Sequence, residues 1–158
     1  MEKWVPTLQK ITDTLNSFLE PFECEAVAGT DFSFWIGSNT IEYTLVVSEV
    51  HIQSFIDFTS KLFPNIKADP FLWSIMHEIG HRETEDDFED EEWEEYQNTV
   101  SDLKSGKDDE TYYNLPIEYA ATYWAGNYMT EHVEEVATLW NKLKPLIAQF
   151  YRETEVER

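Results

Sequence analysis

Residues 77–81 read His-Glu-Ile-Gly-His, and this pattern constrains the fold more than any other segment of the chain. Residues four positions apart lie on one face of a helix, so His77 and His81 can direct both imidazoles at one point. The apolar residues around them recur at helical spacing: Leu72, Ile75, Met76 and Ile79. The histidines fall almost opposite this stripe. The sequence therefore predicts a helix over 69–84, capped by Asp69, with one face in a core and the histidines on the other.

This spacing has a chemical meaning. Two neutral imidazoles on one helical face can bind a single Zn²⁺ ion. Glu78 lies between them and points to a neighbouring part of that face, where it can accept a proton from a water on the metal. A lone histidine is more often a structural residue, but the chain has only four histidines, which makes a chance match uncommon. The pattern predicts a zinc site with Glu78 as its general base.

A catalytic zinc site normally has a third protein ligand and keeps one position for water. The remaining histidines are His51 and His132, and acidic residues are abundant. Glu118 is the best candidate, because it opens a predicted helix over 116–129 behind Pro116. It shares a face with mostly small residues, which permit a close helix approach: Ala121, Thr122, Ala125 and Met129. The alternative is a glutamate placed at a helix start only by the helix dipole.

The two segments together resemble a known family. His-Glu-Ile-Gly-His, followed at 118–125 by Glu-Tyr-Ala-Ala-Thr-Tyr-Trp-Ala, is similar to the small gluzincin metallopeptidases of the ImmA/IrrE and minigluzincin type. The resemblance implies a zinc peptidase with His77, His81 and Glu118 as metal ligands and Glu78 as the catalytic base. The sequence departs from the family in the acidic span of 36 residues between His81 and Glu118, and no helix-turn-helix is evident.

The remaining patterns predict an α+β fold. Segments 22–27, 31–36 and 41–48 read as strands joined by turn-like links. Helices are expected from Pro6 to near Pro21, and over 49–63, 69–84, 116–129 and 131–153, with Pro145 kinking or splitting the last. We expect one minimal zincin-like domain over 1–158, with a three-stranded antiparallel sheet and about six helices. An acidic insertion at about 83–110 should be helical up to Gly106 and a loop over 105–110.

The net charge of −21 limits the partners that the chain can bind. Residues 83–95 hold ten acids among thirteen, and such a field repels nucleic-acid phosphates. It permits a basic protein partner or substrate, although solubility alone would also explain it. We expect no membrane association, because no apolar run approaches spanning length. A single cysteine, Cys24, excludes a disulfide within the chain, which favours the cytoplasm.

The expected function is zinc-dependent hydrolysis of peptide bonds in a protein or peptide substrate. Four side chains are candidates for stabilising the oxyanion: Tyr112, Tyr113, Tyr123 and His132. The alternative is an acidic binding or anti-repressor protein whose metal site is vestigial, structural or absent. A structural zinc would require a fourth protein ligand, supplied by Cys24 or His51. The sequence identifies neither the substrate nor the oligomeric state.

Overall fold

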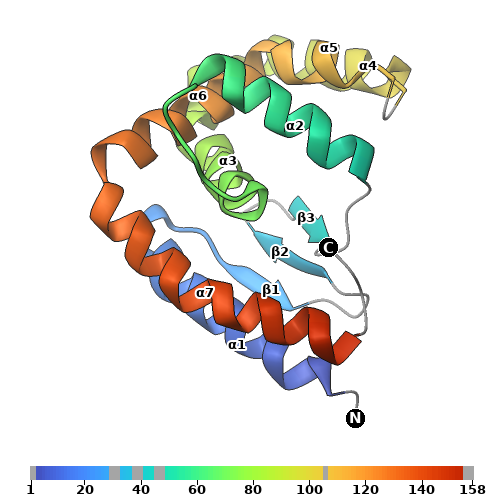
Figure 1. Cartoon of the computed structure of the whole chain (residues 1–158). Helices are drawn as coiled ribbons and strands as arrows, with labels where there is room; N and C mark the ends of the chain where they lie inside the picture. Colours follow the sequence, from blue (N-terminus) through green and yellow to red (C-terminus); the bar gives the residue numbers. More distant parts are fainter. Residues whose placement is uncertain (1–2, 29–32, 37–40, 45–48, 105–106, 155–158) are drawn as a thin grey trace. The chain divides into compact units, whose positions relative to one another are not determined.

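The computed structural model describes residues 3–28, 33–36, 41–44, 49–104 and 107–154; the side chains of 28, 33–36, 41–44 and 49–52 lie outside this description. The chain divides into two compact units. The first unit comprises 1–46 and 132–158, and the second comprises 47–131. Helices make up most of the described residues in both units (Figure 1).

In the first unit, α1 (Trp4–Leu19) packs against α7 (Val133–Thr154). Both helices are amphipathic, and they bury apolar residues spaced by three or four: Leu8, Ile11, Leu15, Leu139, Leu143, Ile147 and Phe150. The Trp4 ring meets Phe150 edge-on, with centroids 6.2 Å apart. Helix α7 runs through Pro145 without interruption, so of the predicted kink or split the split does not occur.

The same unit holds three short antiparallel strands in the order β1-β2-β3: β1 (Ala26–Ala28), β2 (Ser33–Ile36) and β3 (Ile41–Thr44). Ala26 pairs with Ile36 across the first ladder, and Ile36 pairs with Ile41 across the second. The Asn16 side chain fixes β1 to α1, because it donates to the Ala26 carbonyl at 2.9 Å and accepts from the Ala26 amide at 2.6 Å.

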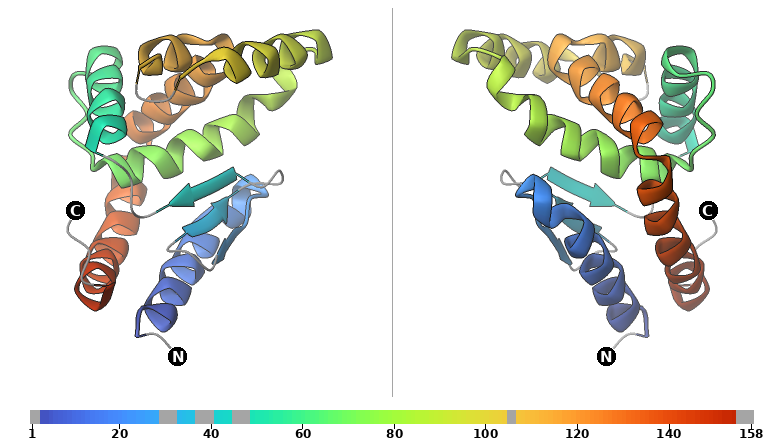
Figure 2. Two further views of the ribbon diagram at one scale, coloured as in Figure 1. Left: turned by 90° about the vertical axis from the view of Figure 1, so that its right-hand side faces the viewer. Right: turned by 90° about the vertical axis from the view of Figure 1, so that its left-hand side faces the viewer.

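The second unit is built from helices alone among its described residues: α2 (Glu49–Leu62), α3 (Pro70–Thr84), the 3-10 turn η2 (Glu85–Asp87), α4 (Asp90–Asp102), α5 (Asp109–Asn114) and α6 (Pro116–Glu131). The most extensive packing is between α3 and α6, which cross each other (Figure 2). Helix α2 packs on α5 and also touches α3. The candidate site lies within this unit.

The predicted α+β zincin-like architecture is wrong, because the described chain is predominantly helical. Its described residues form seven α-helices instead of about six, and the strands have only three or four residues each. One reason lies at Pro21, which belongs to a 3-10 turn (Glu20–Phe22); Glu23 then takes a left-handed backbone with φ of 58°. The expected strand over 22–27 therefore begins only at Ala26.

The acidic segment also differs from its prediction. Residues 83–84 end α3, 85–87 form η2, and α4 ends at Asp102. The expected loop over 105–110 is partly helical, since α5 begins at Asp109. The apolar seam of α4 is half-buried as a group, at Trp93, Tyr96, Val100 and Leu103. The single-domain organisation over 1–158 stays a prediction.

Candidate metal centre

Helix α3 places the two histidines. It starts where predicted, because the Asp69 carboxylate accepts a hydrogen bond from the Phe71 amide at 2.9 Å and Pro70 occupies the first turn. The predicted core stripe is confirmed, with every member at most 4 % exposed: Leu72, Ile75, Met76 and Ile79. The opposite face is not open, because α6 covers it. His77 is consequently buried, and His81 is half-buried.

Helix α6 supplies Glu118, whose side chain is almost completely buried at 1 % exposure. Its approach to α3 depends on Gly80. A Cβ atom at Gly80 would lie 2.3 Å from the Ala121 carbonyl oxygen, well inside van der Waals contact. The small residues that were predicted on α6 are therefore matched by a small residue on α3, which is Gly80. Glycine at position 80 allows the two backbones to touch, and this contact brings Glu118 and Thr122 to the histidines.

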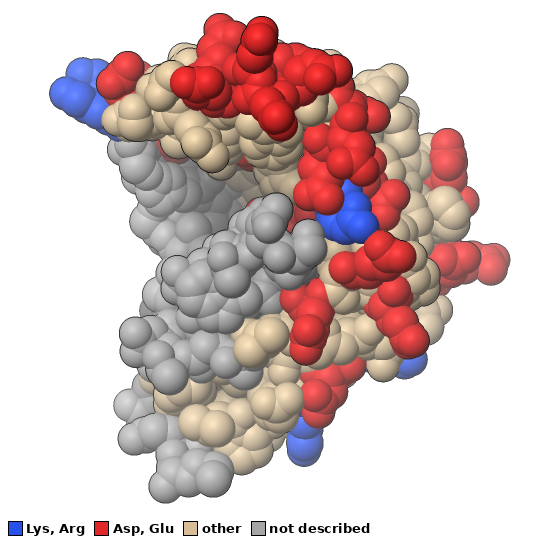
Figure 3. Space-filling view, turned by 180° about the vertical axis from the view of Figure 1, so that it is seen from behind, with Lys and Arg blue, Asp and Glu red and all other residues tan. Residues whose placement is uncertain are grey.

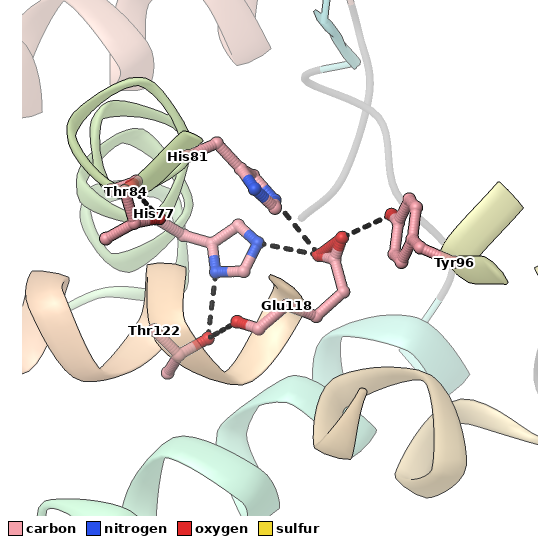
Figure 4. A network of polar contacts seen from close by, with 7 residues as sticks. His77, His81, Thr84, Tyr96, Glu118 and Thr122 are labelled. Atoms are coloured by element: carbon pink, nitrogen blue, oxygen red, sulfur yellow. Dashed lines mark hydrogen bonds and ion pairs between the residues drawn. The ribbon is translucent and has the colours of Figure 1, made fainter. Parts of the chain in front are cut away.

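The three predicted ligands meet at one oxygen atom (Figure 4). Glu118 Oε1 lies 3.0 Å from His77 Nε2 and 3.1 Å from His81 Nε2. The two imidazole rings are nearly perpendicular, with centroids 4.6 Å apart. His77, His81 and Glu118 thus form a largely buried group that could hold a metal ion. No other such group of histidine, cysteine and carboxylate side chains occurs in the parts of the chain that were described.

Thr122 orients His77. Its hydroxyl donates to the Glu118 carbonyl at 3.2 Å and lies 2.8 Å from His77 Nδ1. Because the hydroxyl proton is used on that carbonyl, the threonine oxygen accepts from Nδ1–H. With a metal bound, a neutral His77 would then present the lone pair of Nε2 to the ion. This is the tautomer that a metal ligand requires, held by a neighbouring hydrogen bond.

The charges in the cluster favour an ion pair. Burial alone would raise the pKa of Glu118, but the hydrogen bonds from His77 and His81 outweigh it and hold that pKa well below its usual range. For His81, burial opposes the charged form, yet the hydrogen bond and the charge of Glu118 raise its pKa above the usual value. A proton on His81 would balance the charge of the buried carboxylate.

Glu78 projects next to this cluster. Its Oε2 atom is buried and has no hydrogen-bond partner among the described residues. Burial raises the pKa of Glu78, the two histidines partly offset that rise, and Glu118 adds to it. An unpartnered buried carboxylate oxygen is costly, so its presence beside three metal-type ligands calls for a missing partner.

A second hydroxyl holds the other oxygen of Glu118. Tyr96 reaches in from α4 and donates to Glu118 Oε2 at 2.5 Å (Figure 4). Tyr112 on α5 is hydrogen-bonded in turn to Tyr96. Burial, together with the charge of Glu118, raises the pKa of both tyrosines, so both stay protonated donors. Tyr96 was not among the predicted site residues, and the hydroxyl that it carries among the half-buried apolar residues of α4 was the available sequence signal of a polar role.

The other predicted residues lie elsewhere. Tyr113 packs against Phe55 and Phe58, with ring centroids 5.5 and 5.4 Å away, and burial raises its pKa to about 12. Tyr123 is 51 % exposed. His132 belongs to the first unit, and so does Cys24, while the side chain of His51 lies outside the described residues. Of the oxyanion candidates, Tyr112 is linked to the cluster through its hydrogen bond with Tyr96.

The donor set fits zinc. Tetrahedral ligands about 2.0–2.1 Å from a zinc ion are separated from one another by roughly 3.3 Å. The carboxylate oxygen here lies 3.0 and 3.1 Å from the two imidazole nitrogens, close to that separation, and all the ligand atoms lie within 4.8 Å of one another. Nitrogen and oxygen ligands of this kind suit zinc, although other divalent transition metals share the preference for imidazole.

Comparison with known proteins adds no family. No protein-family model, curated protein or solved structure matches the chain. In the part of the chain that the structure describes, no helix is both long and apolar enough to cross a membrane.

Proposed function

We propose that this chain is a zinc-dependent metallopeptidase that hydrolyses peptide bonds of a protein substrate, of the small gluzincin kind that its motifs resemble. One observation carries the proposal. Three metal-type ligand atoms converge in a largely buried cluster, and a buried carboxylate without a partner among the described residues lies beside them. A base next to a three-ligand site is the arrangement that metal-assisted hydrolysis requires.

The roles of the residues follow from their contacts. His77, His81 and Glu118 would hold the ion, with Thr122 and Tyr96 fixing the orientation of two of these ligands. A bound zinc ion would acidify a water molecule and polarise the scissile carbonyl. Glu78 would accept the proton of the attacking water at Oε2, which has no partner among the described residues, and deliver it to the departing amine. The Tyr112–Tyr96 pair supplies protonated hydroxyls at the edge of the site.

A purely structural metal site is less well supported. Such a site closes its coordination with a fourth protein ligand. Among the described residues only three candidate ligands converge, and the second carboxylate near them, Glu78, lies where a general base would act. An acidic binding protein with a vestigial site would not need the Glu78 carboxylate to be buried and unpartnered.

Metal content and two substitutions test the proposal together. The full chain, purified without added metal and then dialysed against zinc, should retain about one zinc per chain. Glu118→Ala should lose it. Glu78→Gln should keep both fold and zinc but abolish cleavage of a denatured casein substrate, because an amide cannot accept the proton of water.

The matched control is Glu83→Gln, which makes the same change at an exposed position further along α3. It should leave zinc content and cleavage unchanged. Loss of zinc in the Glu78→Gln variant would assign Glu78 to the metal rather than to the reaction. Cleavage at the parent rate in that variant, or a parent chain that binds no zinc, would refute the proposal.

A further inference from the structure

A small cavity lies between α4 and the start of α6, within the second unit. Its volume is about 110 Å³, which is room for one side chain. Its walls are largely apolar: Phe88, Leu115, Pro116 and Ile117. Two exposed carboxylates, Glu92 and Glu95, also line it. The cavity therefore combines an apolar interior with negative charge at its solvent side.

Tyr96 connects this cavity to the candidate metal centre. Its side chain lines the cavity, and its hydroxyl donates to Glu118 Oε2 at 2.5 Å. Ile117, at the inner wall, directly precedes Glu118 in α6. One tyrosine side chain thus separates the cavity from a candidate metal ligand. A residue of a polypeptide bound at the metal could place its side chain there.

We propose that this cavity holds a lysine or arginine side chain of the bound polypeptide and makes the site selective for basic substrates. The inference rests on the proposed function. Lysine and arginine have an apolar stem that packs on apolar walls and a charged end that stays near water. Here the stem would lie against Leu115, Pro116 and Ile117, and the cationic end would meet Glu92 and Glu95. A carboxylate side chain would be repelled at the same place.

The cavity differs from the acidic surface around it. Acidic side chains gather densely on the molecular surface (Figure 3), and nine acids of 83–95 are exposed. A neighbouring hollow on α4 shares Glu95 with the cavity, is otherwise lined by Glu91, Glu94 and Asp102 among others, and has only polar residues in its lining. That hollow offers charge without apolar side chains. Substituting glutamates at the cavity, and in a second variant glutamates outside it, therefore distinguishes recognition by the cavity from attraction by the general negative charge of this surface.

The experiment uses the zinc-loaded full chain and three dipeptide hydroxamates as probes. The hydroxamate group chelates zinc, and the probes differ only in one side chain, which is lysine, norleucine or glutamate. Dissociation constants are measured by calorimetry at low and at moderate salt.

Two double variants are compared with the parent. E92Q/E95Q neutralises the cavity, and E91Q/E94Q makes the same charge change outside it. The Glu92 side chain accepts a hydrogen bond from the Glu89 amide, and the amide oxygen that replaces it in E92Q can accept the same bond. The start of α4 is therefore kept in the cavity variant.

The lysine probe should bind the parent on the order of tenfold more tightly than the norleucine probe, since exposed ion pairs contribute modestly. The glutamate probe should bind most weakly, and the lysine preference should shrink as salt rises. E92Q/E95Q should lose that preference while keeping its affinity for norleucine, and E91Q/E94Q should keep most of it.

Equal binding of the lysine and norleucine probes to the parent would overturn the proposal while leaving the metal centre intact. Equal loss of the lysine preference in both double variants would assign that preference to the negative charge of the whole surface. It would also overturn the proposal that the cavity recognises the side chain. A chain that retains no zinc and binds none of the probes would refute the proposed function, and this inference with it.

Discussion

Replacing Gly80 by alanine should disrupt the metal centre far more than it disrupts the fold. The new Cβ would start 2.3 Å from the Ala121 carbonyl oxygen, whereas an ordinary contact begins near 3.4 Å, so the two backbones must separate by about 1.1 Å. The nearest atoms all belong to the Ala121 backbone, so no side chain can rotate away. Glu118 lies one turn before Ala121 on α6 and would move with it.

The two consequences differ in size. Overpacking of this kind costs about 1–3 kcal/mol, and alanine recovers about 1 kcal/mol over glycine inside a helix. The net loss in the free energy of unfolding should therefore be about 0–2 kcal/mol. Metal–ligand distances tolerate only about 0.2 Å, so the same shift should separate Glu118 from the histidines and lower zinc affinity on the order of a hundredfold.

Zinc affinity is measured by competition with a chromophoric chelator, and stability by urea unfolding of the metal-free chain. Gly126→Ala is the matched control, because its Cβ would strike the Phe63 ring at 2.1 Å, about two turns of α6 beyond Glu118. It should destabilise the fold and spare the zinc affinity. Parent-like zinc affinity in the Gly80→Ala variant would refute the view that this glycine sets the site.

Four further predictions come from the hydrogen bonds of the second unit. Zinc affinity should rise with pH, because binding displaces the proton of His81, whose pKa is raised; calorimetry in two buffers should find about one proton released per zinc below that pKa. In the metal-free chain, the lowered pKa of Glu118 stabilises the fold above about pH 4.5, and the raised pKa of His81 stabilises it below about pH 6.5. The stability gained from this pair should therefore fall on either side of that window. A urea midpoint that stays constant from about pH 3 to about pH 9 would contradict the ion pair. Tyr96→Phe should weaken zinc binding about tenfold by freeing Glu118 Oε2, while Tyr119→Phe, at a position 38 % exposed, should not. Asp69→Ala should lower the free energy of unfolding by about 1 kcal/mol, because it removes the cap at the start of α3, whereas Asp69→Asn should restore most of it.

The site was largely predictable because its residues follow local rules. The spacing of His77 and His81, the cap at Asp69 and the proline before Glu118 each act within one helix, and helical geometry converts them directly into positions. The small residues of α6 also indicated, from the sequence alone, that another helix packs closely against it. Tyr96 was missed because its approach to Glu118 spans 22 residues and depends on how α4 packs, which periodicity alone does not specify.

The fold class was harder to predict because strands depend on partners distant in sequence. Segments 22–27, 31–36 and 41–48 all have β-type residues, and parts of the last two, 31–32 and 45–48, lie outside the described residues. Pro21 and the left-handed Glu23 delay the first strand to Ala26, whose pairing is then limited to three residues of β2. In contrast, 109–114 has no strong apolar period, yet it forms a helix packed on α2 and α6. Tertiary contact decided both outcomes.

The shared oxygen of Glu118 has a practical consequence for anyone who handles this protein. Its Oε1 is bonded to both imidazoles and its Oε2 to a phenol, so we expect these contacts to keep the ligands assembled if a bound ion is removed. Removal of the metal should therefore leave circular dichroism and gel-filtration profiles unchanged. These measurements would not distinguish a preparation without metal from one that contains it. Occupancy needs its own measurement, by elemental analysis of every batch, before any lack of cleavage is attributed to a wrong substrate.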